Sequence, residues 1–328
     1  MQEFQLSLPS GTTLTGRHNL PSPTTTPPPP PPPPPSSTPE TKNHDHKYNR
    51  PLIIALHGGS YTSAYFDMDS TKAATNLSNV LRVPFIAIDR SELKDVSSDN
   101  KSEMYQESDG LRLHDEILPL LWKKYGLATG CTSIVLHSHS MGVPSAIVAA
   151  GLRNTNNNNN TNENTYPLSG LIISGWGTQF VETNPLSAIL SSSPSDPQVV
   201  FEAKGKLDIM LPPWAADSEI REVAVKINLP TPAREMQDAL GEWLVRWGSE
   251  WADKVRVPVM VGIAGRDGLW KGTEEHVVDL VGAFGNSSRV DGSLIPGAPH
   301  NLEVGYWAPG WFARCFGFAV ECALAHEG

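Results

Sequence analysis

One serine stands in a sequence context that is typical of an enzymatic nucleophile. Ser140 is the central residue of the motif Ser-His-Ser-Met-Gly at 138–142, between apolar stretches at 131–137 and 143–150. The first stretch favours a strand and the second a helix. A serine at a sharp strand-to-helix turn projects its hydroxyl beyond the sheet edge, an arrangement called a nucleophile elbow. The motif ends in the glycine that such a close crossing needs, but it begins with a serine where glycine is usual.

A serine hydroxyl needs a base within hydrogen-bond reach, and the base needs an orienting partner. Asp267 follows the apolar run 257–264, and His300 follows a shorter apolar stretch at 293–299. Imidazole suits the role of base because it titrates near neutrality. The order serine, acid, histidine predicts that His300 takes the proton of Ser140 and that Asp267 orients the ring and stabilises the imidazolium.

A glycine-containing loop provides donors for a developing negative charge. The apolar run 51–56 ends in His-Gly-Gly at 57–59. Gly59 has no side chain, so its N–H can approach a ligand closely. We expect the N–H groups of Gly59 and Met141 to form an oxyanion hole. Loss of one such donor typically raises the reaction barrier by about 2.7–4 kcal/mol.

Other acids and one further histidine compete for these roles. Asp279 and Asp291 lie near the third segment, but neither comes immediately after an apolar strand. His276 falls in an expected helix at 273–281, where we predict a surface or lightly buried histidine. These residues are therefore interpreted as structural.

The remaining histidines near the motifs also have structural interpretations. His57 is expected to hold the oxyanion loop through hydrogen bonds, and His137 and His139 to tune packing around the turn. No pair of these histidines has the spacing of a metal site, so we expect no metal and no cofactor.

Jointly and in this order, the elbow, the His-Gly-Gly loop, the Gly-x-Asp turn and the late histidine resemble the α/β-hydrolase superfamily. The chain is similar to serine hydrolases of the AB hydrolase-1 type, including single-domain fungal members, from about residue 51 to the C-terminus. A hairpin of 3–8 with 12–17 is similar to the first two strands of that fold. The resemblance implies a mostly parallel twisted sheet with helices on both faces and a helical cap insertion.

The apolar pattern independently favours an α/β architecture. Strands expected at 83–89 and 168–174 alternate with helices expected at 73–81 and 114–122. Such alternation is typical of a parallel sheet covered on both faces. Sites in such sheets lie beyond the carboxyl ends of the strands, where all three candidate catalytic residues would meet.

We divide the chain into a core, 1–175 with 257–328, and a helical cap, 176–256. The segment 19–50 contains nine consecutive prolines and is expected to be extended or disordered. We interpret it, like the asparagine-rich loop 154–164, as a tolerated insertion; a ligand for SH3- or WW-type domains is the alternative for the proline-rich segment.

Two parts of the expected cap are candidates for contact with substrate. The segment 209–214 is apolar, yet its prolines make it a poor helix, and we predict that Met210 and Trp214 bind substrate. A helix expected to begin at 231–232 carries an apolar stripe, which we expect mainly to pack on the domain beneath. That stripe consists of Met236, Leu240, Trp243, Leu244, Trp247 and Trp251.

Composition excludes several classes of partner. The chain has 328 residues, 25 basic and 35 acidic, and a net charge of −10, which argues against nucleic acid or an anionic membrane as partner. We expect no secretory signal and no membrane span. Cys131, Cys315 and Cys322 form no disulfide framework, which favours a cytoplasmic protein. The oligomeric state stays open.

The sequence therefore predicts a serine hydrolase that cleaves a carboxylic ester, thioester or lactone of a hydrophobic small molecule through an acyl-enzyme. Two alternatives stay open. One is a member that breaks carbon–carbon bonds or rearranges its substrate in small-molecule biosynthesis. The other is a non-enzymatic ligand-binding member.

Overall fold

The computed structural model describes most of the chain. The described residues are 1–22, 49–90, 104–153, 165–182 and 198–326. Most of the proline-rich segment and all of the asparagine-rich loop at 154–164 lie outside these ranges, so the predictions for them are untested.

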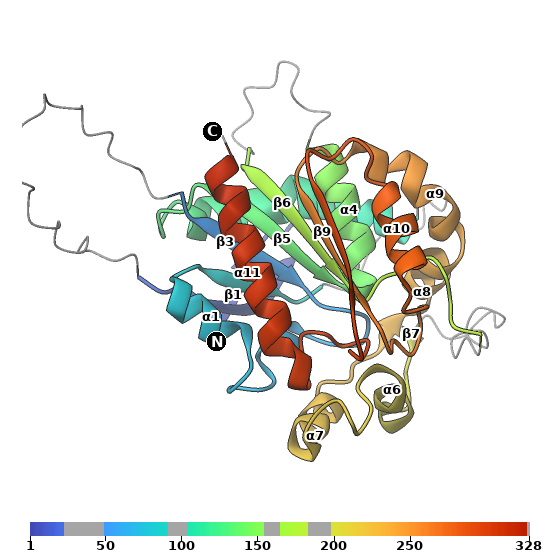
Figure 1. Ribbon diagram of the computed structural model, residues 1–328. Coiled ribbons are helices and arrows are strands. Elements are labelled where there is room, and N and C mark those ends of the chain that lie inside the picture. Colours follow the sequence, from blue (N-terminus) through green and yellow to red (C-terminus); the bar gives the residue numbers. More distant parts are fainter. Residues whose placement is uncertain (23–48, 91–103, 154–164, 183–197, 327–328) are drawn as a thin grey trace, which may run out of the picture.

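An eight-stranded sheet forms the centre of the molecule (Figure 1). Its strands are β1 (Gln2–Ser7), β2 (Thr13–Asn19), β3 (Pro51–Leu56), β4 (Phe85–Ile88), β5 (Ser133–His139), β6 (Leu168–Ser174), β9 (Val259–Ala264) and β10 (Val290–Ile295). They lie in the order β1-β2-β4-β3-β5-β6-β9-β10. The hairpin β1–β2 and the pair β2–β4 are antiparallel, and the other neighbours are parallel. The predicted fold class is confirmed.

Helices cover both faces of this sheet. One hydrophobic cluster includes buried residues of α1 (Ala74–Leu81) and α11 (Ala308–Ala325). The other includes buried residues of α3 (Leu118–Leu121), α4 (Val143–Leu152) and α10 (Glu274–Gly282), and α2 (Tyr105–Arg112) packs against α4. The helix expected at 114–122 belongs to a longer helical run in which π-helical turns flank α3.

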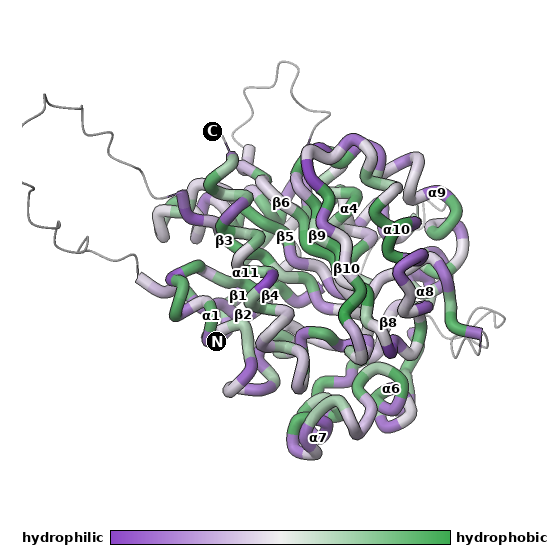
Figure 2. The backbone as a smooth tube through the Cα atoms, in the orientation of Figure 1, coloured by the Kyte–Doolittle hydropathy of each residue, from purple (hydrophilic) through white to green (hydrophobic). Residues whose placement is uncertain are grey.

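Burial explains why the central strands are so apolar. Every residue of β3, β5, β6 and β9 is buried, because helices cover the sheet on both sides. The tube in Figure 2 is accordingly hydrophobic along most of the length of these strands. The edge strand β10 is only partly buried. The carboxyl ends of the parallel strands therefore form a rigid base for the loops that follow them.

The insert at 176–256 connects β6 to β9. It contains the helices α6 (Ala203–Met210), α7 (Ser218–Lys226), α8 (Ala233–Leu240) and α9 (Glu242–Glu250), and a short antiparallel pair, β7 (Gln198–Val199) with β8 (Thr231–Pro232). The helical character was expected, whereas the two short strands were not. Figure 1 shows α6 and α7 beyond the sheet, away from α9.

One local expectation for the insert is wrong, and a second holds only from residue 211 onward. The apolar stripe does not lie on one helix, because Gly241 interrupts it with φ −110° and ψ −105° between α8 and α9. Ile209 and Met210 are helical, since they end α6, and the two prolines that follow at 212–213 stop that helix. Trp243 and Trp247 pack in the core, as the sequence predicted for the stripe.

The structure also bears on the expectations of no disulfide framework and no membrane span. All three cysteines are free and buried, as core thiols should be. Among the described residues, no helix combines the length and the apolar character needed to cross a bilayer.

Candidate active site

Ser140 stands at a sharp turn between β5 and α4. Its backbone φ is +50°, in the left-handed region that costs a non-glycine residue roughly 1–2 kcal/mol. A Cβ on Gly142 would lie 2.9 Å from the His57 carbonyl oxygen, so the crossing needs glycine there. Ser138, where glycine is usual, is tolerated because its buried hydroxyl donates to the Ile172 carbonyl at 3.0 Å.

The structure brings the three predicted residues into one hydrogen-bonded chain. His300 Nε2 lies 3.1 Å from Ser140 Oγ, and His300 Nδ1 lies 3.0 Å from both carboxylate oxygens of Asp267. Asp267 follows β9 and His300 follows β10, and these strands are parallel neighbours. The three side chains are buried. An imidazole held in this way can accept the hydroxyl proton while the carboxylate fixes its tautomer.

Backbone contacts hold the acid in place. Asp267 Oδ1 accepts hydrogen bonds from the N–H groups of Leu269, at 2.8 Å, and Trp270, at 3.2 Å. Asp279 instead accepts from Gln179 at the surface. Asp291 pairs with exposed Arg289 instead. Asp267 is thus the acid that contacts His300.

The predicted oxyanion donors lie next to each other. A Cβ on Gly59 would lie 3.0 Å from Met141 Cγ, and both residues line the cavity that contains Ser140. Within the described part of the chain, neither N–H group has a hydrogen-bond acceptor. Met141 is buried and Gly59 is partly buried, and N–H groups shielded from solvent are rarely left unpaired, so a ligand atom would be a suitable partner.

His57 supports the oxyanion loop, as the sequence suggested. Its Nδ1–H donates to the Gly58 carbonyl at 2.7 Å, and its Nε2 accepts from the Arg90 N–H at 3.1 Å. Burial and the neighbouring Arg90 lower the pKa of His57 to about 3, so the ring stays neutral. Arg90 also pairs with Glu235 of α8, which ties the loop to the insert.

Comparison with known proteins identifies the fold. No family model matches the sequence, and no curated protein matches it. An esterase from Thermogutta terrifontis aligns over 98% of this chain and 100% of its own, with 13% identity and a TM-score of 0.57. A soluble variant of monoglyceride lipase from Saccharomyces cerevisiae covers 95% of this chain and 92% of its own, with 13% identity and a TM-score of 0.57. The chain has the α/β-hydrolase fold.

The fold alone does not choose the chemistry. MenH from S. aureus shares it, with 84% of this chain and 95% of its own covered, 18% identity and a TM-score of 0.51. Function must therefore be argued from the residues that this α/β-hydrolase fold places around Ser140.

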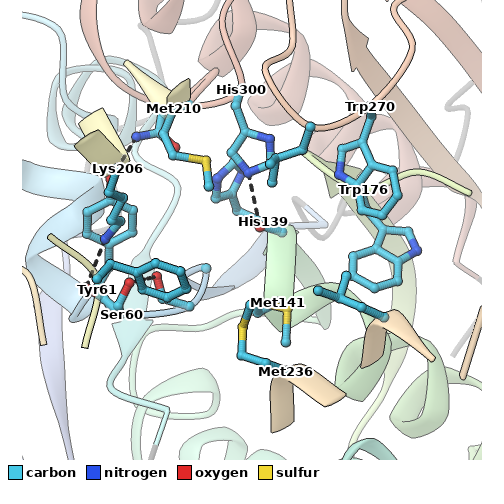
Figure 3. Close-up of a pocket in the computed structure, with 17 residues that line it drawn as sticks. Ser60, Tyr61, His139, Met141, Trp176, Lys206, Met210, Met236, Trp270 and His300 are labelled. Carbon is cyan, nitrogen blue, oxygen red and sulfur yellow. Dashed lines mark hydrogen bonds between the residues drawn. The ribbon is translucent and has the colours of Figure 1, made fainter. Parts of the chain in front are cut away.

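The cavity beside Ser140 has two different sides. Figure 3 shows Trp176 and Trp270 on one side of His300, and Lys206 and Tyr61 on the other. The two tryptophan rings lie 5.5 Å apart and form an apolar wall with neighbouring leucines. Sequence reasoning named none of these four residues, because each contributes to the cavity only through the tertiary fold.

One of the two predicted substrate-binding residues lines this cavity. Met210, at the end of α6, contributes to it, but Trp214 does not. Trp214 packs on Trp307 instead, with ring centroids 5.8 Å apart, and the Arg266 guanidinium carbon lies 4.1 Å from the centre of the Trp214 ring. The prolines that end α6 separate the two predicted residues. Met236 of the apolar stripe does line the cavity.

A buried carboxylate behind Ser140 is the residue that the sequence analysis missed most clearly. Glu303 has no exposed side-chain surface, and hydrogen-bond donors surround it. These are Trp311 Nε1 at 2.8 Å, Ser174 Oγ at 2.5 Å, Tyr65 Oη at 2.9 Å, His137 Nε2 at 3.1 Å and His139 Nδ1 at 3.1 Å. The feature of the sequence that could have indicated Glu303 is its position three residues after His300.

The charge state of Glu303 follows from these contacts. Burial alone would raise the pKa of the carboxyl, but the imidazoles of His139 and His137 and their hydrogen bonds hold it well below its usual range. Burial lowers the pKa of His139 despite the carboxylate. An ionised Glu303 thus accepts from a neutral His139 ring. The His139 ring also meets His300 edge-on, at 5.1 Å between centroids.

His276 corrects a further expectation. It is fully buried rather than at the surface. Its Nδ1–H donates to the Lys271 carbonyl at 2.7 Å, and its Nε2 accepts from the Thr178 N–H at 2.9 Å. Over the ranges that the structure describes, no group of three or more His, Cys, Asp or Glu side chains is placed to hold a metal ion.

Proposed function

We propose that this protein is a serine hydrolase that cleaves a carboxylic ester, thioester or lactone of a hydrophobic small molecule through an acyl-enzyme. The observation that carries the proposal is the continuous chain from Ser140 Oγ through His300 to Asp267 at a largely apolar cavity. Esterases and lipases among the similar structures support it.

In the acylation step, His300 Nε2 takes the proton of Ser140 as Oγ bonds to the acyl carbon. The electron pair of the carbonyl moves to its oxygen, which the N–H groups of Gly59 and Met141 stabilise. Asp267 stabilises the imidazolium that forms. His300 then donates the proton to the leaving oxygen or sulfur, and the acyl group stays on Ser140.

Deacylation repeats this sequence with water as the nucleophile. His300 takes a proton from the water as its oxygen bonds to the acyl carbon, and the same two N–H groups receive the negative charge. Collapse of the intermediate breaks the bond to Ser140, and His300 returns the proton to its oxygen. The carboxylic acid is released, and the enzyme regains its starting state.

We further propose that the insert acts as the cap and selects the substrate. Met210 of α6 and Met236 of α8 contribute flexible apolar surface to the cavity, opposite the fixed groups of the sheet. Trp176 and Trp270 provide a rigid apolar wall. An acyl or alcohol group of apolar character would be buried there, which supports a hydrophobic substrate.

A fluorophosphonate probe tests this function directly. We expect wild type to become labelled at Ser140 and Ser140→Ala to remain unlabelled. Ser60→Ala controls for the other serine that lines the cavity and should be labelled at Ser140. Labelling of Ser140→Ala equal to that of wild type would refute the assignment.

A further inference from the structure

The cavity contains a cation, Lys206, that has no acidic partner among the described residues. Lys206 of α6 is only 6% exposed. Its ammonium donates to the Ser60 carbonyl and to Asn228 Oδ1, both at 3.1 Å, and lies 3.4 Å from the centre of the Tyr61 ring. These partners are dipoles and a ring face. Among the described residues, Lys206 forms no ion pair.

Burial of an unpaired ammonium is energetically unfavourable. Lysine is almost never fully buried without an acidic partner, because the desolvated charge costs several kcal/mol. Lys72 shows the usual arrangement, since it is more exposed and lies 2.7 Å from Asp69. Neutral oxygen atoms and an aromatic face reduce the cost for Lys206 but do not cancel the charge. The missing counter-charge is expected from a ligand.

The position of Lys206 connects this charge to the reacting centre. Its acceptor Ser60 follows Gly59, the proposed oxyanion donor, and both residues line the same cavity as Ser140. The neighbouring Tyr61 hydroxyl accepts a hydrogen bond from Asn301 Nδ2 at 3.0 Å. Within the described ranges, the Tyr61 hydroxyl proton has no acceptor of its own. A cation and a free O–H donor therefore lie side by side.

We propose that Lys206 and Tyr61 bind a carboxylate of the substrate, so that the enzyme selects acyl esters that carry a free carboxylate besides the bond that is cleaved. The two tryptophans on the opposite side of His300 would take the apolar part of the same substrate (Figure 3). This inference deepens the proposed function and rests on it. Lys206 is here a specificity-determining residue that contacts substrate remote from the reacting carbonyl.

Paired substrates separate the charge from the shape of the acyl group. The probes are p-nitrophenyl monoesters of linear dicarboxylic acids with about four to six carbons, each with the remote carboxyl either free or as its methyl ester. Hydrogen bonds to a charged group are worth about 1.5–3 kcal/mol, so wild type should prefer at least one free acid by roughly 10- to 100-fold in kcat/KM. Lys206→Met should lose this preference and keep its rate on the methyl esters.

Lys204→Met is the matched control, because Lys204 lies on the same helix but is exposed. It should keep the preference of wild type. Thermal unfolding of each variant checks that it is folded. The proposal is overturned if wild type prefers no free acid at any length, or if Lys206→Met loses both kinds of substrate equally. In the latter case Lys206 only holds the Ser60 loop.

Binding measurements keep this inference separate from the hydrolase proposal. Calorimetry on Ser140→Ala, with and without Lys206→Met, reports affinity for the same esters without turnover. We expect Lys206→Met to weaken binding of the free acid by roughly 10-fold or more and to leave the methyl ester unaffected. Equal affinities would overturn the carboxylate site, even if hydrolysis itself is confirmed. If Lys206→Met weakens binding of the free acid alone but wild type hydrolyses none of the esters, only the hydrolase proposal is overturned.

Discussion

The two sides of the Ser140 turn differ in how their buried charged groups are paired. Behind the turn, the buried Glu303 carboxylate accepts from two aromatic side chains, a serine and two imidazoles. On the cavity side, Lys206 lacks an acid and Asn301 Oδ1 lacks a donor among the described residues. Satisfied buried groups stabilise a fold, whereas unsatisfied ones reduce its stability and are retained where a ligand completes them.

This difference assigns separate tasks to the two sides. The Glu303 network touches His139, the residue before Ser140, and so holds the strained turn in place. In the proposed function, the cavity side supplies groups that contact substrate. Substitutions behind the turn should therefore reduce stability first, and substitutions at the cavity should reduce activity first.

The largest expected effect lies on the cavity side. Asp267→Asn keeps an oxygen for the Leu269 N–H but no longer favours the tautomer that leaves His300 Nε2 free to accept a proton. We expect kcat to fall by about 10⁴-fold with little change in melting temperature. Ester hydrolysis and thermal unfolding check this result. Asp279→Asn, on exposed α10 surface, should match wild type. A loss below tenfold for Asp267→Asn would argue against the assigned role.

The next largest effect lies behind the turn. Glu303→Gln turns an amide N–H₂ toward groups that are themselves donors, so the free energy of unfolding should fall by about 3 kcal/mol. Urea unfolding measures this change. Glu321→Gln is the control, because the exposed ion pair of Glu321 with Arg289 should contribute at most about 1 kcal/mol to the free energy of unfolding. Equal losses of unfolding free energy for the two substitutions would contradict the proposed difference between the buried Glu303 network and the exposed Glu321 pair.

The contribution of Glu303 should also depend on pH. Its pKa in the folded protein is held well below the value of 4.5 for a free glutamate. The unfolded state therefore binds the proton first as the pH falls, and the stabilisation is complete above about pH 4.5 and lost progressively below it. The difference in unfolding free energy between wild type and Glu303→Gln should be constant from pH 7 to about 5.5. A difference that already shrinks above pH 6 would be inconsistent with this account.

The smallest expected effect concerns the charge of Lys206 on the cavity side. Burial lowers the pKa of Lys206 to about 7, while His57 and Tyr61, the titratable neighbours on the described residues, have pKa values of about 3 and about 12. Only Lys206 of these three changes charge near neutrality. The preference for free acids should thus be full at pH 6 and decline several-fold by pH 8.

The ratio of kcat/KM for each free acid and its methyl ester measures that preference. A change of protonation elsewhere in the proposed catalytic machinery affects both substrates equally and cancels in this ratio. Lys206→Met should show a ratio that does not vary with pH. A wild-type ratio that is flat from pH 6 to 8 would show that the Lys206 charge does not take part.

Much of the fold and of the candidate site was predictable because local signals carried it. Buried parallel strands need continuous apolar runs, and Ser140, Asp267 and His300 each follow such a run or its edge strand. Other positions were missed or misjudged where neighbours distant in the chain decide. His276 is buried by the loop at 178–179, and Trp214 turns to Trp307. Gly241 breaks a helix that periodicity alone would continue.

The sequence by itself determined the order of strands and helices, and it placed each candidate catalytic residue at the carboxyl end of a strand, because apolar periodicity and turn residues act over a few positions. Only the tertiary structure decided that Glu303 lies behind Ser140 and that Lys206 enters the cavity without an acid. Those outcomes depend on packing between segments up to hundreds of residues apart. The burial of a charged side chain and the choice of its partner are properties of that packing and leave no local pattern in the chain.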